Sequence, residues 1–235
     1  MKVSPRNARH AEVMATPHPE VSEASCMPSR WPERNPEAIR AICDRGSGLV
    51  DLWEASPVRI ESNIPLTDEI IDTLFPGNPL LCCGWSRHRF ETRPRRNWHK
   101  MDRLQLIVPN PMTERDGITL EGKSSQHTLS NTGPRRFLVI EQDRGDIDEQ
   151  SAILIRLAEK APLALVVHSG GKSLHGWFHC EGVSEEITKP FMDYAVSLGA
   201  DPATWTRLQF IRMPDGLRNN GKRQAVYFFN PNVIT

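Results

Sequence analysis

The chain has 235 residues, enough for one large domain with a buried core. An apolar content of 38%, apolar runs far shorter than a bilayer span and no apolar signal core argue against a membrane partner, so we expect a cytoplasmic protein. The 29 basic and 29 acidic residues give a formal net charge of zero, so the overall charge indicates no nucleic-acid partner.

The first third of the chain contains little regular pattern. Residues 1–35 are rich in Pro, Ser and mixed charge, which predicts a flexible N-terminal segment ahead of a domain spanning 36–235. The sequence NPEAIRAICDRG predicts a short helix capped by Asn35 and stopped at Gly46. A second short helix is predicted from Thr67 to the Pro76-Gly77 break.

Basic residues are concentrated in two segments. Residues 85–103 carry a net charge of +5 with three interleaved aromatic rings, and residues 204–223 carry +4. Basic side chains neutralise phosphates and aromatic rings stack on bases, so these segments predict single-strand binding, although such charge runs also occur on ordinary solvated faces. The candidate nucleic-acid-binding residues are Arg87, Arg89, Arg93, Arg95, Arg96, Trp98, Arg218, Lys222 and Arg223.

The five cysteines form no C-x-x-C pair, which argues against a disulfide framework and a zinc ribbon. Free thiols are the simpler interpretation. A metal site that uses Cys83, His88 and His99 is the alternative.

The second half of the chain has the clearest periodicity. LQLIVPNPM and RRFLVIEQD predict strands, and DIDEQSAILIRLAEK predicts an amphipathic helix capped by Asp146. Two strands, 163–168 and 173–179, flank a Gly-Gly turn. A helix capped at Ser184 and stopped at Gly199 follows, and then the strands RLQFIR and QAVYFFN.

This order predicts an α+β fold with an RRM-like or ferredoxin-like βαββαβ catalytic core, at about 134–235, and an N-terminal α/β elaboration. In that arrangement the sheet is antiparallel and its third strand lies between the first and second. Both helices cover one face. The opposite face is then free for chemistry.

The turn sequence SGGKS first suggests a nucleoside-triphosphate P-loop. That motif requires a glycine five positions before Gly171, where this chain has Val166, so a P-loop is excluded. Gly170 and Gly171 suit a tight turn whose amides, with the ammonium group of Lys172, favour an anion. The histidine His175 follows on the next strand.

Glu141 and Asp143 lie two positions apart in a strand, about 6.8 Å along it, and therefore on one side of the sheet. Leu138 and Ile140 face the helices instead. Paired carboxylates leaving an apolar strand favour Mg²⁺ or Mn²⁺, because hard cations prefer oxygen ligands. The alternative is that the strand ends there and both acids are solvated.

Three motifs in this order resemble those of the archaeo-eukaryotic primase superfamily, especially the primase-polymerase domains of plasmids, phages and mobile elements. They are the apolar strand ending in ExD, then SGGKSLH, then GADPATWTRLQFIRMPDGLRNNGKRQ, and the resemblance covers roughly residues 70–235. It implies two divalent metal ions held by Glu141, Asp143 and a later aspartate. It also implies that Ser169, Lys172 and His175 contact the incoming nucleotide and that Arg207 and Arg212 support nucleotide or template.

The later aspartate is ambiguous. Asp201 fits the position upstream of the arginines, and Asp215 is the alternative. We therefore expect a DNA primase/polymerase that uses a single-stranded DNA template and nucleoside triphosphates, with a separate helicase supplying unwinding. A non-catalytic single-strand-binding module and a metal-dependent nuclease are the rival interpretations.

Overall fold

The computed structural model describes residues 30–234, which form an α+β fold with antiparallel sheets and five α-helices. Most of the predicted flexible segment 1–35 lies outside the described residues. Trp31–Thr235 is one compact unit, so the residues just before the first helix already belong to it. The backbone N–H of Asn35 donates to the carbonyl of Ser197 (2.7 Å), and Arg34 pairs with Glu149 (2.9 Å).

Three short helices come first in the chain. Helix α1 (Pro36–Cys43) begins as predicted, with the Asn35 side chain accepting from the N–H of Ala38 at 3.0 Å. Helix α3 (Thr67–Leu74) also confirms its prediction. Helix α2 (Leu49–Glu54) was not predicted, because six residues are too few to establish a helical period.

The central sheet has the order β10-β7-β8-β6. Its strands are β6 (Phe137–Gln142), β7 (Leu163–His168), β8 (Leu174–His179) and β10 (Val226–Phe229). The hairpin strand β8 lies between β6 and β7, which confirms that part of the prediction. Strand β10 pairs with β7, so β6 and β10 are the two edge strands of this sheet.

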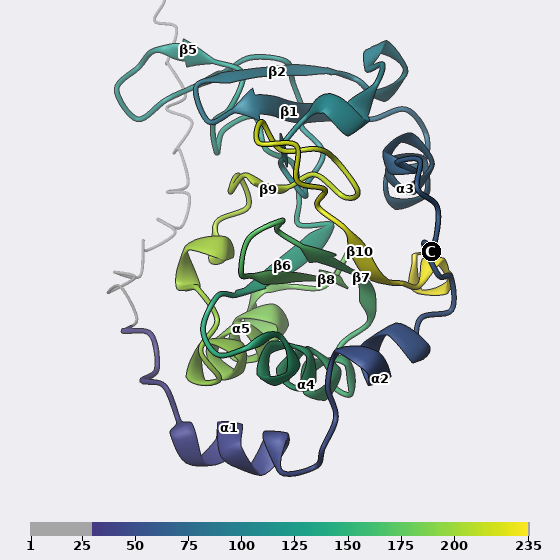
Figure 1. The fold of residues 1–235 in the computed structure, drawn as a ribbon. Helices are drawn as coiled ribbons and strands as arrows, with labels where there is room; N and C mark the ends of the chain where they lie inside the picture. Colours follow the sequence, from purple (N-terminus) through teal and green to yellow (C-terminus); the bar gives the residue numbers. More distant parts are fainter. Residues whose placement is uncertain (1–29, 235) are drawn as a thin grey trace, which may run out of the picture. The chain divides into compact units, whose positions relative to one another are not determined.

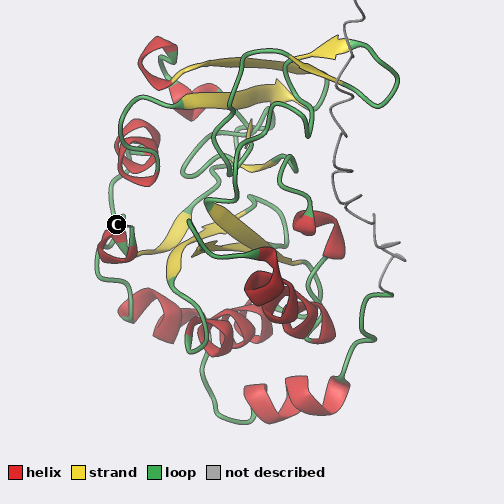
Figure 2. Cartoon of the chain, turned by 180° about the vertical axis from the view of Figure 1, so that it is seen from behind, coloured by secondary structure: helices red, strands yellow, loops and turns green. Residues whose placement is uncertain are grey.

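Helices α4 (Ile147–Ala158) and α5 (Glu185–Ser197) both lie on one face of the central sheet (Figure 1, Figure 2). Leu138 and Ile140 pack among their apolar residues, as the alternation along β6 predicts. Asp146 caps α4 by accepting from two backbone N–H groups. Ser184 occupies the cap position of α5, but its side chain makes no capping hydrogen bond there.

The opposite face of the central sheet is covered rather than free, which corrects the prediction. Phe137, Val139 and Trp177 on that face join a second apolar core with α3 and an N-terminal sheet. That sheet has the order β2-β1-β3-β9. Its strands are β1 (Leu80–Ser86), β2 (Arg89–Pro94), β3 (Leu106–Ile107) and β9 (Ile211–Arg212).

The prediction of a strand over RLQFIR is mostly wrong. Only Ile211–Arg212 is a strand, and it pairs with β3 of the N-terminal sheet. The remaining elements are the hairpin strands β4 (Gly117–Ile118) and β5 (Ser124–Ser125) and the 3₁₀ turns Arg95–Asn97, Met101–Arg103, Pro202–Trp205 and Pro231–Val233. Within residues 30–234, no helix has the length and apolar character needed to cross a bilayer.

Candidate active site

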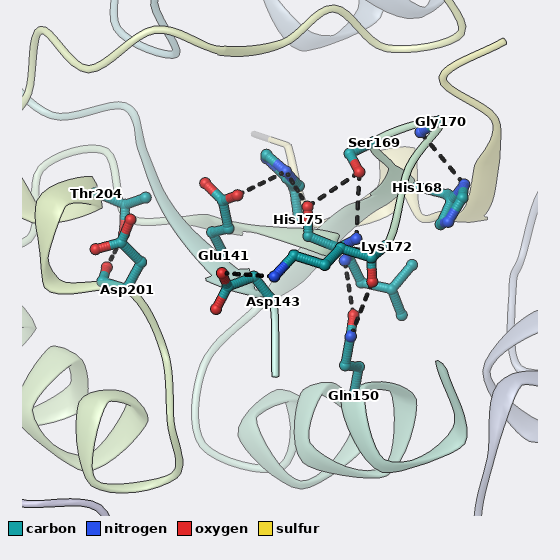
Figure 3. Close-up of polar contacts among 12 residues, drawn as sticks. Glu141, Asp143, Gln150, His168, Ser169, Gly170, Lys172, His175, Asp201 and Thr204 are labelled. Carbon is teal, nitrogen blue, oxygen red and sulfur yellow. Dashed lines mark hydrogen bonds and ion pairs between the residues drawn. The ribbon is translucent and has the colours of Figure 1, made fainter. Parts of the chain in front are cut away.

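The site begins where β6 ends beside the start of β8. Glu141 and His175 are direct cross-strand partners, and Glu141 Oε1 lies 3.5 Å from His175 Nε2 (Figure 3). Paired residues on adjacent antiparallel strands project to the same face, so this contact follows from the register. The prediction that His175 shares the face of Glu141 is confirmed.

His175 is a neutral imidazole. It is 2% exposed, and burial, followed by the charges of Arg212 and His168, lowers its pKa to about 3. Its Nε2 lies 3.4 Å from the hydroxyl of Ser173, while Nδ1 has no partner among the described residues. At neutral pH it offers a hydrogen bond and not a positive charge.

The turn between β7 and β8 is held together by its own side chains. Gly170 has φ +71°, which a glycine adopts without strain, and its N–H donates to His168 Nδ1 (3.3 Å). The hydroxyl of Ser169 accepts from the N–H of Ser173 (3.2 Å). The side chain of Ser169 and the amide of Gly170 therefore shape the turn, and fewer amides than predicted remain for an anion.

Lys172 extends from this turn into solvent. Its ammonium lies 3.4 Å from Asp143 Oδ2, and its side chain is 77% exposed (Figure 3). An exposed ion pair of this kind contributes little stability, so Lys172 is free to exchange Asp143 for a more strongly charged anion.

Gln150 on α4 holds the turn between β7 and β8 in place, a role that was not predicted from the sequence. This buried side chain accepts from the N–H of Leu174 (2.9 Å) and donates to the carbonyls of Lys172 (2.9 Å) and Gly145 (3.2 Å). A polar residue among the apolar residues of an amphipathic helix was the available signal.

Asp143 follows the end of β6, and Asp201 reaches the same place from the chain after α5. The N–H of Asp201 donates to the carbonyl of Glu141 (3.0 Å), while the Asp201 carboxylate accepts from the N–H of Ala203 (2.9 Å). Burial, and then the charges of Asp201 and Asp143, raise the pKa of Glu141. The negative charges of Asp201 and Asp143 therefore both act on Glu141.

Asp215, the alternative third acid, has a structural role. It is buried, and its Oδ2 accepts from the N–H of Leu66 (2.6 Å) at the start of α3. Arg223 binds the same carboxylate with two nitrogens, at 2.5 and 2.6 Å. These contacts occupy both Asp215 and Arg223, so Arg223 is unsuited to the nucleic-acid role predicted for it.

The N-terminal sheet supplies the basic side of the site. A cavity of about 220 Å³, here called the basic cavity, is lined by Arg87 from the β1–β2 turn, by Arg212 from β9 and by Glu141 and His175. Burial, and then the charge of Arg218, lower the pKa of Arg212, with Arg87 adding to the effect. Three arginines from separate segments thus approach one another here.

Two glycines let Arg218 lie close against the Lys172 turn. A side chain at Gly170 would approach Arg218 Cδ to 3.1 Å, and one at Gly171 would approach its guanidinium to 3.4 Å. Arg207 lies outside this group, because it donates to the carbonyl of Gly133 (2.8 Å) and does not line the basic cavity.

The predicted nucleic-acid-binding residues divide into two groups. Arg95 is buried and paired with Asp68 (2.9 Å) and Asp72 (2.8 Å). Trp98 is buried and donates to the carbonyl of Leu81 (3.2 Å). Both are structural, which corrects those predictions. Arg93 lies over the Trp98 ring, 5.0 Å from its centroid, and pairs with Glu91. The residues that remain exposed are Arg87, Arg89, Arg96 and Lys222.

Among residues 30–234, no group of three His, Cys, Asp or Glu side chains is gathered tightly enough to hold a metal ion. The alternative zinc site has no support, because Cys83 is completely buried and burial raises the pKa of its thiol. The carboxylate oxygens of Glu141, Asp143 and Asp201 are the donor type that Mg²⁺ or Mn²⁺ prefers, but in this structure the three side chains do not form such a group.

The site thus combines Glu141 and the neutral His175 with arginines on one side and with Asp143 and Asp201 on the other. Comparisons with protein-family models, curated proteins and solved structures found no match to this chain.

Proposed function

We propose that this chain is a DNA primase/polymerase, a template-directed nucleotidyltransferase of the archaeo-eukaryotic primase type. The observation that carries the proposal is the contact between Glu141 and His175. The acids Asp143 and Asp201 lie on one side of this pair, and Arg87 and Arg212 lie on the other. Nucleotidyl transfer needs both, because a polyphosphate must be bound next to the group that positions the attacking hydroxyl.

The fold is compatible with this proposal. The run β6-α4-β7-β8-α5 follows the βαββα order of a ferredoxin-like core, with both helices on one face. The position of β10 beside β7 is a departure from that arrangement, which places its last strand beside the first. The departure leaves the β6 edge, and thus Glu141, next to Asp201.

The basic side chains would hold the triphosphate. Lys172, Arg212 and Arg218 surround the end of the sheet near His175, and charged donors bind phosphate oxygens more strongly than neutral ones do. His175 would add a neutral N–H donor. Arg87 would complete the cluster from the N-terminal sheet.

Glu141, Asp143 and Asp201 would hold Mg²⁺ or Mn²⁺, which when bound supplies charge stabilisation for the attacking and leaving oxygens. In the reaction, the 3′-oxygen of one nucleotide bonds to the α-phosphorus of the next. The bond to the β-phosphate breaks, pyrophosphate leaves, and the hydroxyl proton passes to solvent. The protein's own part is to orient the two substrates about Glu141 and His175.

Single-stranded DNA would be bound through exposed arginines and through Lys222, by backbone charge and with little base preference. Arg89 lies over the ring of Trp85, 4.7 Å from its centroid, and offers a guanidinium plane on which a base can stack. A separate helicase would unwind the duplex.

The test is primer synthesis or extension on single-stranded template with Mg²⁺ or Mn²⁺ and labelled nucleotides. The Glu141→Ala/Asp143→Ala variant should give no product. Glu114→Ala/Asp116→Ala is the matched control, because these two acids have the same spacing but are exposed and do not line the basic cavity. Equal product from both variants, or none from folded wild-type protein, would contradict the proposal.

A non-catalytic single-strand-binding module is the second candidate. It is favoured by the Lys172–Asp143 pair and by the absence, within residues 30–234, of a tight three-ligand cluster. Template binding without product would indicate this module. Template cleavage that requires no nucleotide would indicate a nuclease instead.

A further inference from the structure

The segment from Asp201 to Trp205 lies along the edge strand β6 and runs in the opposite direction. At one end, the N–H of Asp201 donates to the carbonyl of Glu141 (3.0 Å), near the end of β6. At the other end, the carbonyl of Trp205 accepts from Arg135 (2.8 Å), which comes just before β6 in the chain. The segment is therefore anchored at both ends of the same strand.

Arg135 is a buried cation that contacts Trp205 in two ways. Besides its hydrogen bond to the Trp205 carbonyl, its guanidinium lies over the indole ring, 4.3 Å from the centroid. Its side chain is 5% exposed and also reaches Glu185 at the start of α5 (3.5 Å). Burial of a cation is costly unless the charge is paired, so these contacts hold the guanidinium and the indole together. Trp205 is thereby fixed relative to the start of β6.

The 3₁₀ turn Pro202–Trp205 connects the two anchors. The hydroxyl of Thr204 donates to the carbonyl of Asp201 (2.9 Å; Figure 3). The Asp201 carboxylate caps the turn by accepting from the N–H of Ala203 (2.9 Å). Since these bonds close the turn on itself, a displacement of Trp205 is passed on to Asp201.

Trp31, from the segment ahead of α1, packs against the same indole. The rings of Trp31 and Trp205 meet edge to face, with their centroids 6.3 Å apart. Trp31 also lines a cavity of about 390 Å³ together with Asp143 and Asp201. The three sequence motifs lie within residues 70–235, so they did not indicate that the chain ahead of α1 contributes to this region.

We propose that Arg135 is a positioning residue, which keeps Asp201 in place beside Glu141 through Trp205 and the 3₁₀ turn. This inference rests on the proposed function, in which Asp201 and Glu141 act together, and deepens it. Arg135 lines neither the basic cavity nor the cavity beside Asp201, so its removal should leave nucleotide affinity unchanged. The rate should fall instead, because a displacement of about 1 Å at a reacting centre can cost about a hundredfold.

Arg136 provides the matched control for Arg135. Its side chain is 11% exposed, but it donates to the carbonyl of Leu74 on α3 (2.8 Å) and pairs with Glu181. Arg135→Met and Arg136→Met each remove a largely buried cation just ahead of β6, so both should lower the urea midpoint. Only Arg135→Met releases Trp205.

Hydrogen exchange followed by NMR on the full chain tests this coupling without catalysis. In Arg135→Met, the N–H of Asp201 should exchange at least tenfold faster relative to the amides of the central strand β8, because its anchor at Trp205 is lost. In Arg136→Met, the ratio of the two exchange rates should stay at the wild-type value. An unchanged ratio in Arg135→Met would overturn the proposal.

Primer extension separates positioning from a merely structural role. Arg135→Met should lower kcat at least tenfold with the KM for nucleotide unchanged, and Arg136→Met should keep both values at a temperature where it is folded. Arg135→Lys retains the charge without the planar stack, so it should fold and show both changes to a smaller extent. It replaces Arg135→Met if that variant does not fold.

Equal kcat values in folded Arg135→Met and Arg136→Met, or a raised KM with unchanged kcat in Arg135→Met, would overturn the proposal. If folded wild-type protein makes no product, the proposed function fails. The hydrogen-exchange ratio then still decides whether Arg135 holds Asp201 in place.

Discussion

Glu141 on β6 and His175 on β8 are cross-strand partners whose side chains approach to 3.5 Å, and burial affects the pKa values of the two groups in opposite directions. It raises the pKa of Glu141 and lowers that of His175 to about 3. Both shifts favour the uncharged forms. A cationic ligand near Glu141 would favour its ionised form and so oppose the shift in its pKa.

The first prediction concerns His175 and acid. An unfolded chain takes up a proton at His175 near pH 6.5, but the native state resists this until about pH 3. The stability that the neutral form contributes is present above pH 6.5 and is lost as the pH falls through this window, by up to about 1.4 kcal/mol per pH unit. With a metal chelator in the buffer, the free energy of unfolding of His175→Gln, measured in urea, should depend less steeply on pH between pH 6 and 4 than that of wild type. His88→Gln, at an exposed position, serves as the control. An unchanged slope in His175→Gln would contradict the assignment.

The second prediction concerns Glu141 without metal. Its raised pKa means that ionisation opposes folding, so the native state loses stability as the pH rises through the pKa of Glu141. Glu141→Gln should therefore have a higher urea midpoint than wild type at pH 7.5, and the difference should shrink towards pH 4. Glu114→Gln, at an exposed position, serves as the control. Equal urea midpoints for Glu141→Gln and wild type at pH 7.5 would show that ionisation of Glu141 does not destabilise the native state.

The third prediction concerns Gln150 beneath the Lys172 turn. Gln150→Leu removes three hydrogen bonds and leaves the N–H of Leu174 unpaired, so it should cost about 2–3 kcal/mol of folding free energy. It should also raise the KM for nucleotide, because the turn that carries Lys172 would lose the hydrogen bonds that fix its position. Gln150→Glu keeps the acceptor for Leu174 and should retain part of both properties. A variant with wild-type KM would show that Gln150 does not position the turn.

The fourth prediction separates structural from ligand-binding arginines. Arg95→Met should lower stability by about 1–3 kcal/mol, because it removes buried hydrogen bonds to α3, with DNA affinity of the folded protein unchanged. Arg218→Gln should leave stability within about 0.5 kcal/mol of wild type and weaken binding of single-stranded DNA or nucleotide, with a smaller salt dependence. Urea unfolding and fluorescence anisotropy at several salt concentrations measure the two effects. If Arg95→Met weakened DNA binding and Arg218→Gln lowered stability instead, the assignment of a structural role to Arg95 and a binding role to Arg218 would be wrong.

Local periodicity determined much of the C-terminal half of this protein. The alternation along β6 correctly separated Glu141 from Leu138 and Ile140, and the Gly-Gly turn between two strands was identified from adjacent residues alone. These features depend on neighbours in the chain, which a single sequence displays directly.

Only the tertiary structure decided how the remaining residues are used. Arg95 and Arg96 are adjacent and equally basic, yet one is buried against α3 and the other is exposed. The sequence favoured Asp201 and left Asp215 as the alternative, and only the structure shows that Arg223 and the start of α3 occupy Asp215. The N-terminal sheet, which brings Arg87 and Arg212 to Glu141, forms through pairings such as Leu106 with Arg212. Such contacts join residues about a hundred positions apart, and no pattern within one segment of the sequence specifies them.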